Sequence, residues 1–183
     1  TARNPRSTVG TTTEIYDYLR LLFARIGKTT CHKCGGIVRR DSVRTVTEAL
    51  SAEAGGTGQL KLHVMFPLQA HQKATLREEL DNLKKQGYFR ILYKGELLDL
   101  NERTPPAKAV KDDILVLVDR LVYRFDAEDK RLADSIELAF RAGDGYAVIA
   151  LPDDGRMLRF NQQFACPRCG IRYEEPDPRL FSF

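Results

Sequence analysis

The sequence has no long hydrophobic run, and this absence excludes integral membrane proteins with helical spans. Nowhere in the 183 residues does an apolar stretch approach the roughly 18 residues that a transmembrane helix needs. The N-terminal stretch TARNPRSTVG carries positive charge with no apolar segment behind it, so we predict no secretion signal. We therefore expect a cytoplasmic protein.

The sequence also lacks the residue patterns of a catalytic centre. It contains no Ser/His/Asp set, no convincing pair of carboxylates and no glycine-rich dinucleotide turn. Gly27-Lys28-Thr29 resembles the end of a phosphate-binding loop, but that loop needs an earlier glycine where this sequence has Leu22. The loop must also precede its helix, whereas Gly27 follows one. We predict that this chain alone is not an enzyme and does not bind ATP.

Cysteine is scarce, but the four cysteines are grouped. They form two pairs, Cys31/Cys34 and Cys166/Cys169, each in the pattern Cys-x-x-Cys-Gly. In an intracellular chain this spacing favours a metal over a disulfide, and four thiolates make a closed, structural zinc site. We favour one composite site made by all four. Two alternatives stay open: each pair uses ligands outside this chain, or the cysteines are free and reduced.

The overall composition is that of a soluble globular protein, with 43% hydrophobic and 30% charged residues. Its net charge of +4 permits a nucleic-acid partner without requiring one. A zinc-stabilised module that grips duplex DNA is therefore a competing hypothesis. The candidate DNA contacts are five arginines near the N-terminus and the first cysteine pair: Arg3, Arg6, Arg39, Arg40 and Arg44.

Hydrophobic periodicity predicts four helices. The first follows a Thr11/Glu14 capping box and ends at Gly27, and shorter helical patterns cover 41–50, 73–87 and 126–145. Strands are expected where apolar residues alternate or β-branched residues are enriched, at 59–66, 88–100, 114–125, 146–151 and 156–160. The range 88–100 reads as two strands around a turn at Lys94-Gly95. This order predicts an α/β (α+β) fold.

Two arginines interrupt apolar strands and are candidate partner contacts. Arg90 lies in YFRILY and Arg120 in LVDRLVY, where alternation places each on the strand face opposite the core. An arginine on a rigid strand loses little entropy when its planar guanidinium pairs with a carboxylate. The alternative is an ordinary solvated strand face, which the pattern alone does not exclude.

Several longer stretches resemble the UvrA family, the damage-recognition ATPase subunit of bacterial nucleotide excision repair. They are RNPRSTVGTTTEIYDYLRLLFARIG, the VDR strand, FACPRCG and above all EPDPRLFSF, and they occur in colinear order from about residue 3 onward. The resemblance implies a fragment of a paired ABC-type ATPase, in which ATP is bound by the parent protein only.

The resemblance also implies a domain plan and partners. Residues 1–57 and 161–183 would form a helical, zinc-stabilised neck, and 58–160 an inserted small mixed sheet with packed helices that binds UvrB. By position within matching motifs, Arg90 and Arg120 would make charged contacts with UvrB. The coupling factor Mfd, whose module resembles UvrB, would use the same face. DNA would be bound through the parent protein.

Overall fold

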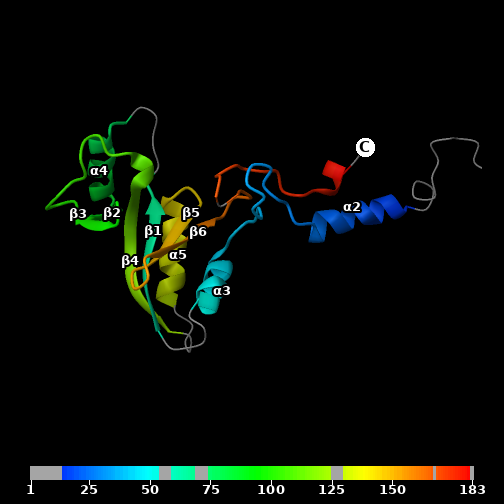
Figure 1. The fold of residues 1–183 in the computed structure, drawn as a ribbon, viewed down its shortest axis with the longest axis horizontal. Helices are drawn as coiled ribbons and strands as arrows, with labels where there is room; N and C mark the ends of the chain where they lie inside the picture. Colours follow the sequence, from blue (N-terminus) through cyan, green and yellow to red (C-terminus); the bar gives the residue numbers. More distant parts are fainter. Residues whose placement is uncertain (1–13, 54–58, 69–73, 125–129, 167, 182–183) are drawn as a thin grey trace, which may run out of the picture. The chain divides into compact units, whose positions relative to one another are not determined.

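The computed structural model describes residues 14–53, 59–68, 74–124, 130–166 and 168–181 (Figure 1). The chain divides into two compact units. Residues 40–163 form one, here called the sheet unit, and residues 1–39 together with 164–183 form the other, the knuckle unit. Within the described ranges, none of the helices has the length and apolar character needed to cross a bilayer.

The sheet unit is built on six strands in the order β3-β2-β4-β1-β5-β6, and every neighbouring pair is antiparallel. The long central pair is β1 (Gln59–Pro67) and β4 (Ile114–Arg124). One edge is a hairpin of β2 (Arg90–Tyr93) and β3 (Glu96–Asp99), and the other is β5 (Tyr146–Leu151) with β6 (Arg156–Asn161). A 3-10 turn, η1 (Lys111–Asp113), leads into β4.

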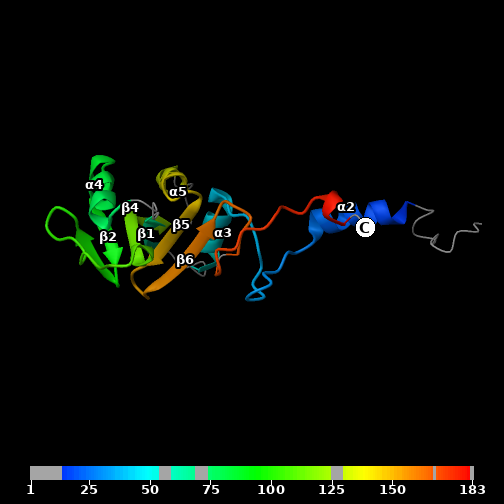
Figure 2. The ribbon, with the colours of Figure 1, turned by 90° about the horizontal axis from the view of Figure 1, so that it is seen from above.

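Three helices cover one face of this sheet: α3 (Val43–Glu53), α4 (Leu76–Lys85) and α5 (Lys130–Ala142), as Figure 2 shows from above. Leu50, Leu83 and Phe140, one from each helix, belong to the same buried cluster as the inward residues of all six strands. Burial of this apolar surface is the main term that holds the unit together. We call the other side of the sheet the open face.

A β-bulge in β4 decides which face Asp119 and Arg120 occupy. The register with β1 steps from Val64↔Asp119 to Met65↔Leu117, which leaves Val118 as the extra residue. Asp119 lies on the helix side, where its carboxylate accepts hydrogen bonds from Arg131 and Ser135 of α5. Arg120, the next residue, therefore points to the open face.

Local sequence signals account for the β2–β3 hairpin and for α4. Lys94 and Gly95 both have positive φ, 49° and 83°, as a two-residue hairpin turn of the mirror-image type requires. Helix α4 begins after Thr75, whose side chain accepts from the Glu78 N–H while Glu78 bonds back to the Thr75 N–H. This is a complete capping box.

The knuckle unit holds α2 (Ile15–Ile26) and a short 3-10 turn, η2 (Pro178–Phe181), which meet through the Phe23 and Phe181 rings at a centroid distance of 6.1 Å. None of the residues of α2 is buried. The predicted capping box at its start is wrong. Glu14 precedes the helix with φ 57° and makes no side-chain cap hydrogen bond, and Thr11 lies outside the described residues.

The predicted α+β class, with helices packed on a small sheet, is confirmed. The division at 1–57, 58–160 and 161–183 stays a prediction about functional segments. By packing, the units change at residues 39/40 and 163/164, because Val46 and Leu50 of α3 belong to the core of the sheet unit.

Candidate metal centre and open sheet face

The two Cys-x-x-Cys stretches fold into the same small loop. In the first, the Cys31 N–H donates to the Gly36 carbonyl and the Gly35 N–H donates to the Cys31 carbonyl. In the second, the Cys166 N–H donates to the Ile171 carbonyl and the Gly170 N–H donates to the Cys166 carbonyl. Gly35 and Gly170 have the same φ of 67°, which only glycine adopts without strain. We call these loops the two knuckles.

Short bridges frame each knuckle in the same way. Thr30 pairs with Ile37 around the first, and Ala165 pairs with Arg172 around the second. A further bridge, Arg39↔Ala165, joins the two loops side by side. The first cysteine of each knuckle, Cys31 or Cys166, is buried, and the second is more exposed. The pair is thus a structural repeat assembled from the two ends of the chain.

The four thiol groups meet at one point. The Sγ atoms of Cys31, Cys34, Cys166 and Cys169 all lie within 4.8 Å of one another, and Cys34 Sγ is 3.5 Å from Cys166 Sγ. A tetrahedral zinc ion with Zn–S bonds of about 2.3 Å spaces its sulfurs by roughly 3.8 Å. The donor set and its dimensions therefore fit a four-thiolate metal site.

Tyr173 and His32 surround the buried thiol of Cys31. The Tyr173 hydroxyl accepts from the His32 N–H at 3.1 Å and lies 2.9 Å from His32 Nδ1. Its hydrogen bond to Cys31 is the main cause that lowers the pKa of that thiol to about 6. The hydrogen bond with Cys34, with burial second, raises the pKa of Cys169 to about 12. The cluster thus already favours one thiolate before a metal adds its charge.

Where the chain enters and leaves the sheet unit, its two segments are tied together by hydrogen bonds. The Asp41 N–H donates to the Asn161 carbonyl at 2.7 Å, and the Asn161 N–H donates to the Asp41 carboxylate at 2.9 Å. Arg40 Nε donates to the Gln162 carbonyl at 2.8 Å. Asp41 and Asn161 are buried, so the two bonds between them are shielded from water, whereas the Arg40 bond is exposed.

The open face of the sheet carries an apolar cluster of its own although no described helix covers it. Met65, Leu115, Leu117, Val148 and Ala150 are buried there, with Leu92 and Leu97 packed against them. The cluster lies next to a cavity of about 290 Å³ that is lined from β4, from the β2–β3 hairpin and from β6. In the sheet order β1 and β5 separate β4 from β6, so the cavity extends across several strands of this face.

Arg90 and Arg120 both belong to this open face. Arg90 alternates with Ile91, which is in the helix-side core, and its Nε lies 3.6 Å from the Asp99 carboxylate across the hairpin. Arg120 is exposed and makes no ion pair with any residue in the described ranges. The structure thus brings the two predicted arginines to one surface. Their contacts with a partner stay a prediction.

His63 is a residue of this face that the sequence patterns did not single out. It pairs with Arg120 on β4 and with Ala150 on β5. Burial, and then the positive charge of Arg120, lower the pKa of His63 below its usual value. Its alternation with Leu62 and Val64 was the available signal, because those neighbours face the helix-side core.

The proposed DNA-binding arginines do not form one described group. Arg40 bonds to Gln162 as above, and Arg44 pairs with Glu48 on the next turn of α3 at 2.7 Å. Arg39 is exposed and forms the bridge with Ala165 that joins the two knuckles. Arg3 and Arg6 lie outside the described residues. DNA contact through these side chains stays a prediction.

Comparison with known proteins identifies the family. The UvrA interaction domain matches residues 42–153, which is almost the whole sheet unit. The chain belongs to the UvrA family.

Individual relatives match over the full length of the chain. It is 39% identical to the UvrABC system protein A of Listeria innocua, 41% identical to that of Halalkalibacterium halodurans and 40% identical to that of Thermus thermophilus. These alignments cover 100% of this chain and 19% of each relative. The chain therefore spans about a fifth of the length of these UvrA proteins.

Proposed function

We propose that this chain is the partner-docking region of UvrA, and that it recruits UvrB to damaged DNA during nucleotide excision repair. The observation that carries the proposal is the open face, where Arg90 and Arg120 flank an apolar floor on one side of an interaction-domain sheet. Stable interfaces commonly have an apolar centre with arginines as energetic anchors.

The charge of the open face indicates the chemistry of the partner. By strand alternation, the strands place one acidic side chain, Asp99, and five basic side chains on it: Lys61, Arg90, Arg120, Arg124 and Arg159. Asp112 and Asp113 of η1 add two carboxylates at the cavity, and Lys61 is paired with Asp153, so the excess on this face is basic but smaller than the strands alone give. An acidic surface on UvrB would complement them, and charge complementarity speeds association and fixes register. The same face would serve the UvrB-like module of Mfd.

For the metal centre we propose one structural zinc ion bound by Cys31, Cys34, Cys166 and Cys169. Four thiolates leave no open position for a substrate, so zinc would supply stability and no catalysis. ATP binding would belong to the remainder of UvrA, since the sequence of this chain has no phosphate-binding loop. Location in the cytoplasm, where UvrA would meet DNA, is part of the same proposal.

Titration calorimetry of the chain with UvrB tests the docking function. We expect binding by the wild type and its collapse in Arg90→Ala/Arg120→Ala, because each desolvated interface arginine is worth about 2 kcal/mol or more. Arg77→Ala/Arg141→Ala, with arginines on α4 and α5, is the matched control and should bind normally. Equal affinity of the wild type and the Arg90/Arg120 variant would refute the docking face.

A DNA titration separates the competing hypothesis. If the candidate arginines Arg3, Arg6, Arg39, Arg40 and Arg44 bind duplex DNA, the affinity must fall steeply as the salt concentration rises, because salt cations compete with arginine for the phosphates. Absence of duplex binding even at low salt would eliminate DNA binding by this fragment.

A further inference from the structure

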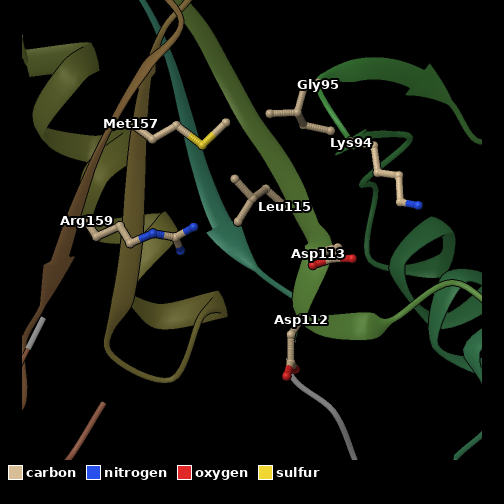
Figure 3. Close-up of a pocket in the computed structure, with 8 residues that line it drawn as sticks. Lys94, Gly95, Asp112, Asp113, Leu115, Met157 and Arg159 are labelled. Carbon is tan, nitrogen blue, oxygen red and sulfur yellow. The ribbon is translucent and has the colours of Figure 1, made fainter. Parts of the chain in front are cut away.

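The cavity on the open face extends the proposed docking function, on which this inference rests. Leu92, Leu115 and Met157 supply its apolar lining, and its charged lining residues are Lys94, Arg159 and the Asp112/Asp113 pair. Figure 3 shows Met157 and Arg159 pointing from β6 toward Leu115 on β4, with the two aspartates on the other side. Met157 is 40% exposed, so its side chain is accessible to a partner at the cavity.

The size of the cavity indicates what it can hold. Its volume of about 290 Å³ lies at the lower end of ligand pockets, which run from roughly 300 to 1,000 Å³. It also lacks an aromatic side chain among its lining residues, so base stacking does not explain it. One or two partner side chains fit this space better than a nucleotide or a cofactor.

The two arginines lie on the same face of the sheet as the cavity. Leu92 pairs with Leu115 across β2 and β4, and Arg90 lies two residues from Leu92 on the same side of β2. That spacing is roughly 7 Å along a strand. Arg120 lies further along β4 from Leu115, at a spacing of roughly 17 Å. A single partner segment can therefore reach the cavity and both arginines.

The charges on the two sides of the cavity favour one orientation of that partner segment. Arg159 is exposed and has no ion pair among the described side chains, so its guanidinium is available to a carboxylate. On the opposite rim Asp112 and Asp113 would repel one. Lys94, the other cation of the lining, has its ammonium over the Tyr93 ring at 5.6 Å from the centroid. An acidic segment that seats an apolar side chain here is therefore favoured with its carboxylate on the Arg159 side.

We infer that this cavity receives an apolar side chain from an acidic segment of UvrB, with Arg159 binding a neighbouring carboxylate, so that Met157 and Arg159 are affinity determinants beyond Arg90 and Arg120. The flexible thioether of Met157 suits an apolar contact that must adapt to a partner. The β6 edge of the sheet thereby becomes part of the docking surface.

Calorimetry with UvrB tests the inference through two pairs of variants. Met157→Trp fills the cavity and Arg159→Ala removes its cation, and each should weaken binding about 10-fold, equivalent to about 1.4 kcal/mol. Leu138→Trp and Arg141→Ala are the controls, because Leu138 on α5 is 41% exposed and both residues lie in the helix layer. The controls should bind like the wild type.

Methionine NMR gives a second readout that needs no substitution. The chain has two methionines, Met65 buried in the open-face floor and Met157 at the cavity, so two methyl signals report on this face. The Met157 signal, assigned with Met157→Leu, should shift on addition of UvrB. A free Arg159→Ala protein that keeps both signals at wild-type positions, and a free Met157→Trp protein that keeps the Met65 signal, are correctly folded.

The outcomes separate the two proposals. If UvrB binds the wild type and needs Arg90 and Arg120, but Met157→Trp and Arg159→Ala bind normally and the methyl signals stay in place, the cavity inference is wrong and the docking function stands. If the wild type does not bind UvrB, both fail.

Discussion

The knuckle unit and the sheet unit are stabilised by different interactions. The sheet unit buries a continuous apolar core between three helices and six strands. In the knuckle unit the described buried cluster consists of Cys31, Val38 and Cys166, with a few half-buried neighbours such as Tyr173. So small a cluster cannot offset the entropy of ordering two loops. The metal would stabilise the first unit as hydrophobic burial stabilises the second.

Removing the metal should give the largest effect and should separate the two units. Structural zinc contributes about 10–16 kcal/mol of apparent binding energy in small domains, so a chelator should unfold the knuckles. Amide NMR signals of the knuckles should collapse while those of β1, β4 and α5 persist. Metal analysis should give about one zinc per chain, and Cys31→Ser/Cys34→Ser should lose it.

Two results would contradict this account. Full zinc content in the Cys31/Cys34 variant would rule out a composite four-cysteine site. Loss of the sheet signals on chelation would mean that the sheet unit does not fold independently.

Truncating a core side chain of the sheet unit should have the opposite effect: it should destabilise the sheet unit and leave the metal site intact. Phe140 is 1% exposed in the centre of the sheet-unit core, so Phe140→Ala should lower the free energy of unfolding by about 3–5 kcal/mol. Urea unfolding measures this loss. Zinc content should remain unchanged, and Leu138→Ala on the exposed side of α5 should cost far less. A drop in zinc content at low urea would show that the units are coupled.

Matched substitutions in the two knuckles test whether the two loops contribute equally to metal affinity. Alanine in the left-handed region costs roughly 1–2 kcal/mol, so Gly35→Ala and Gly170→Ala should each weaken metal affinity about 5- to 30-fold. Competition with a coloured chelator measures the affinities. Gly155 has a similar φ of 72° but lies in the sheet unit, so Gly155→Ala should leave metal affinity unchanged. Clearly unequal effects at Gly35 and Gly170 would contradict the equivalence.

The smallest expected effect concerns His63. Its pKa is lowered in the folded state, so between the usual value of about 6.5 and the folded value the unfolded chain binds more protons. The free energy of unfolding should therefore fall as pH drops through this window and level off below it. The His63→Gln variant should lack this contribution of His63 to the pH dependence of the free energy of unfolding. Urea midpoints measured from about pH 8 to pH 5 test the difference, and parallel profiles for the two proteins would refute it.

Much of the fold was predictable because its signals are local. Alternation in 59–66 and the β-branched run at 114–125 give the central strand pair, and positive-φ residues at Lys94-Gly95 give the hairpin turn. The start of α2 was predicted wrongly, because Glu14 adopts a left-handed conformation that a capping-box pattern does not reveal. The sharing of α3 with the sheet core was also not visible, since Val46 and Leu50 pack on residues far away in sequence.

By itself, the sequence determined the number and chemistry of the candidate metal ligands, the positions of the strands and the candidate arginines. Residue type and short-range periodicity carry that information. Only the tertiary structure decided that the four sulfurs meet within 4.8 Å, because their pairs are separated by more than a hundred residues. It also decided the cavity at Met157 and Arg159, since its lining comes from β4 and β6, which are far apart in the sequence and separated by two strands in the sheet.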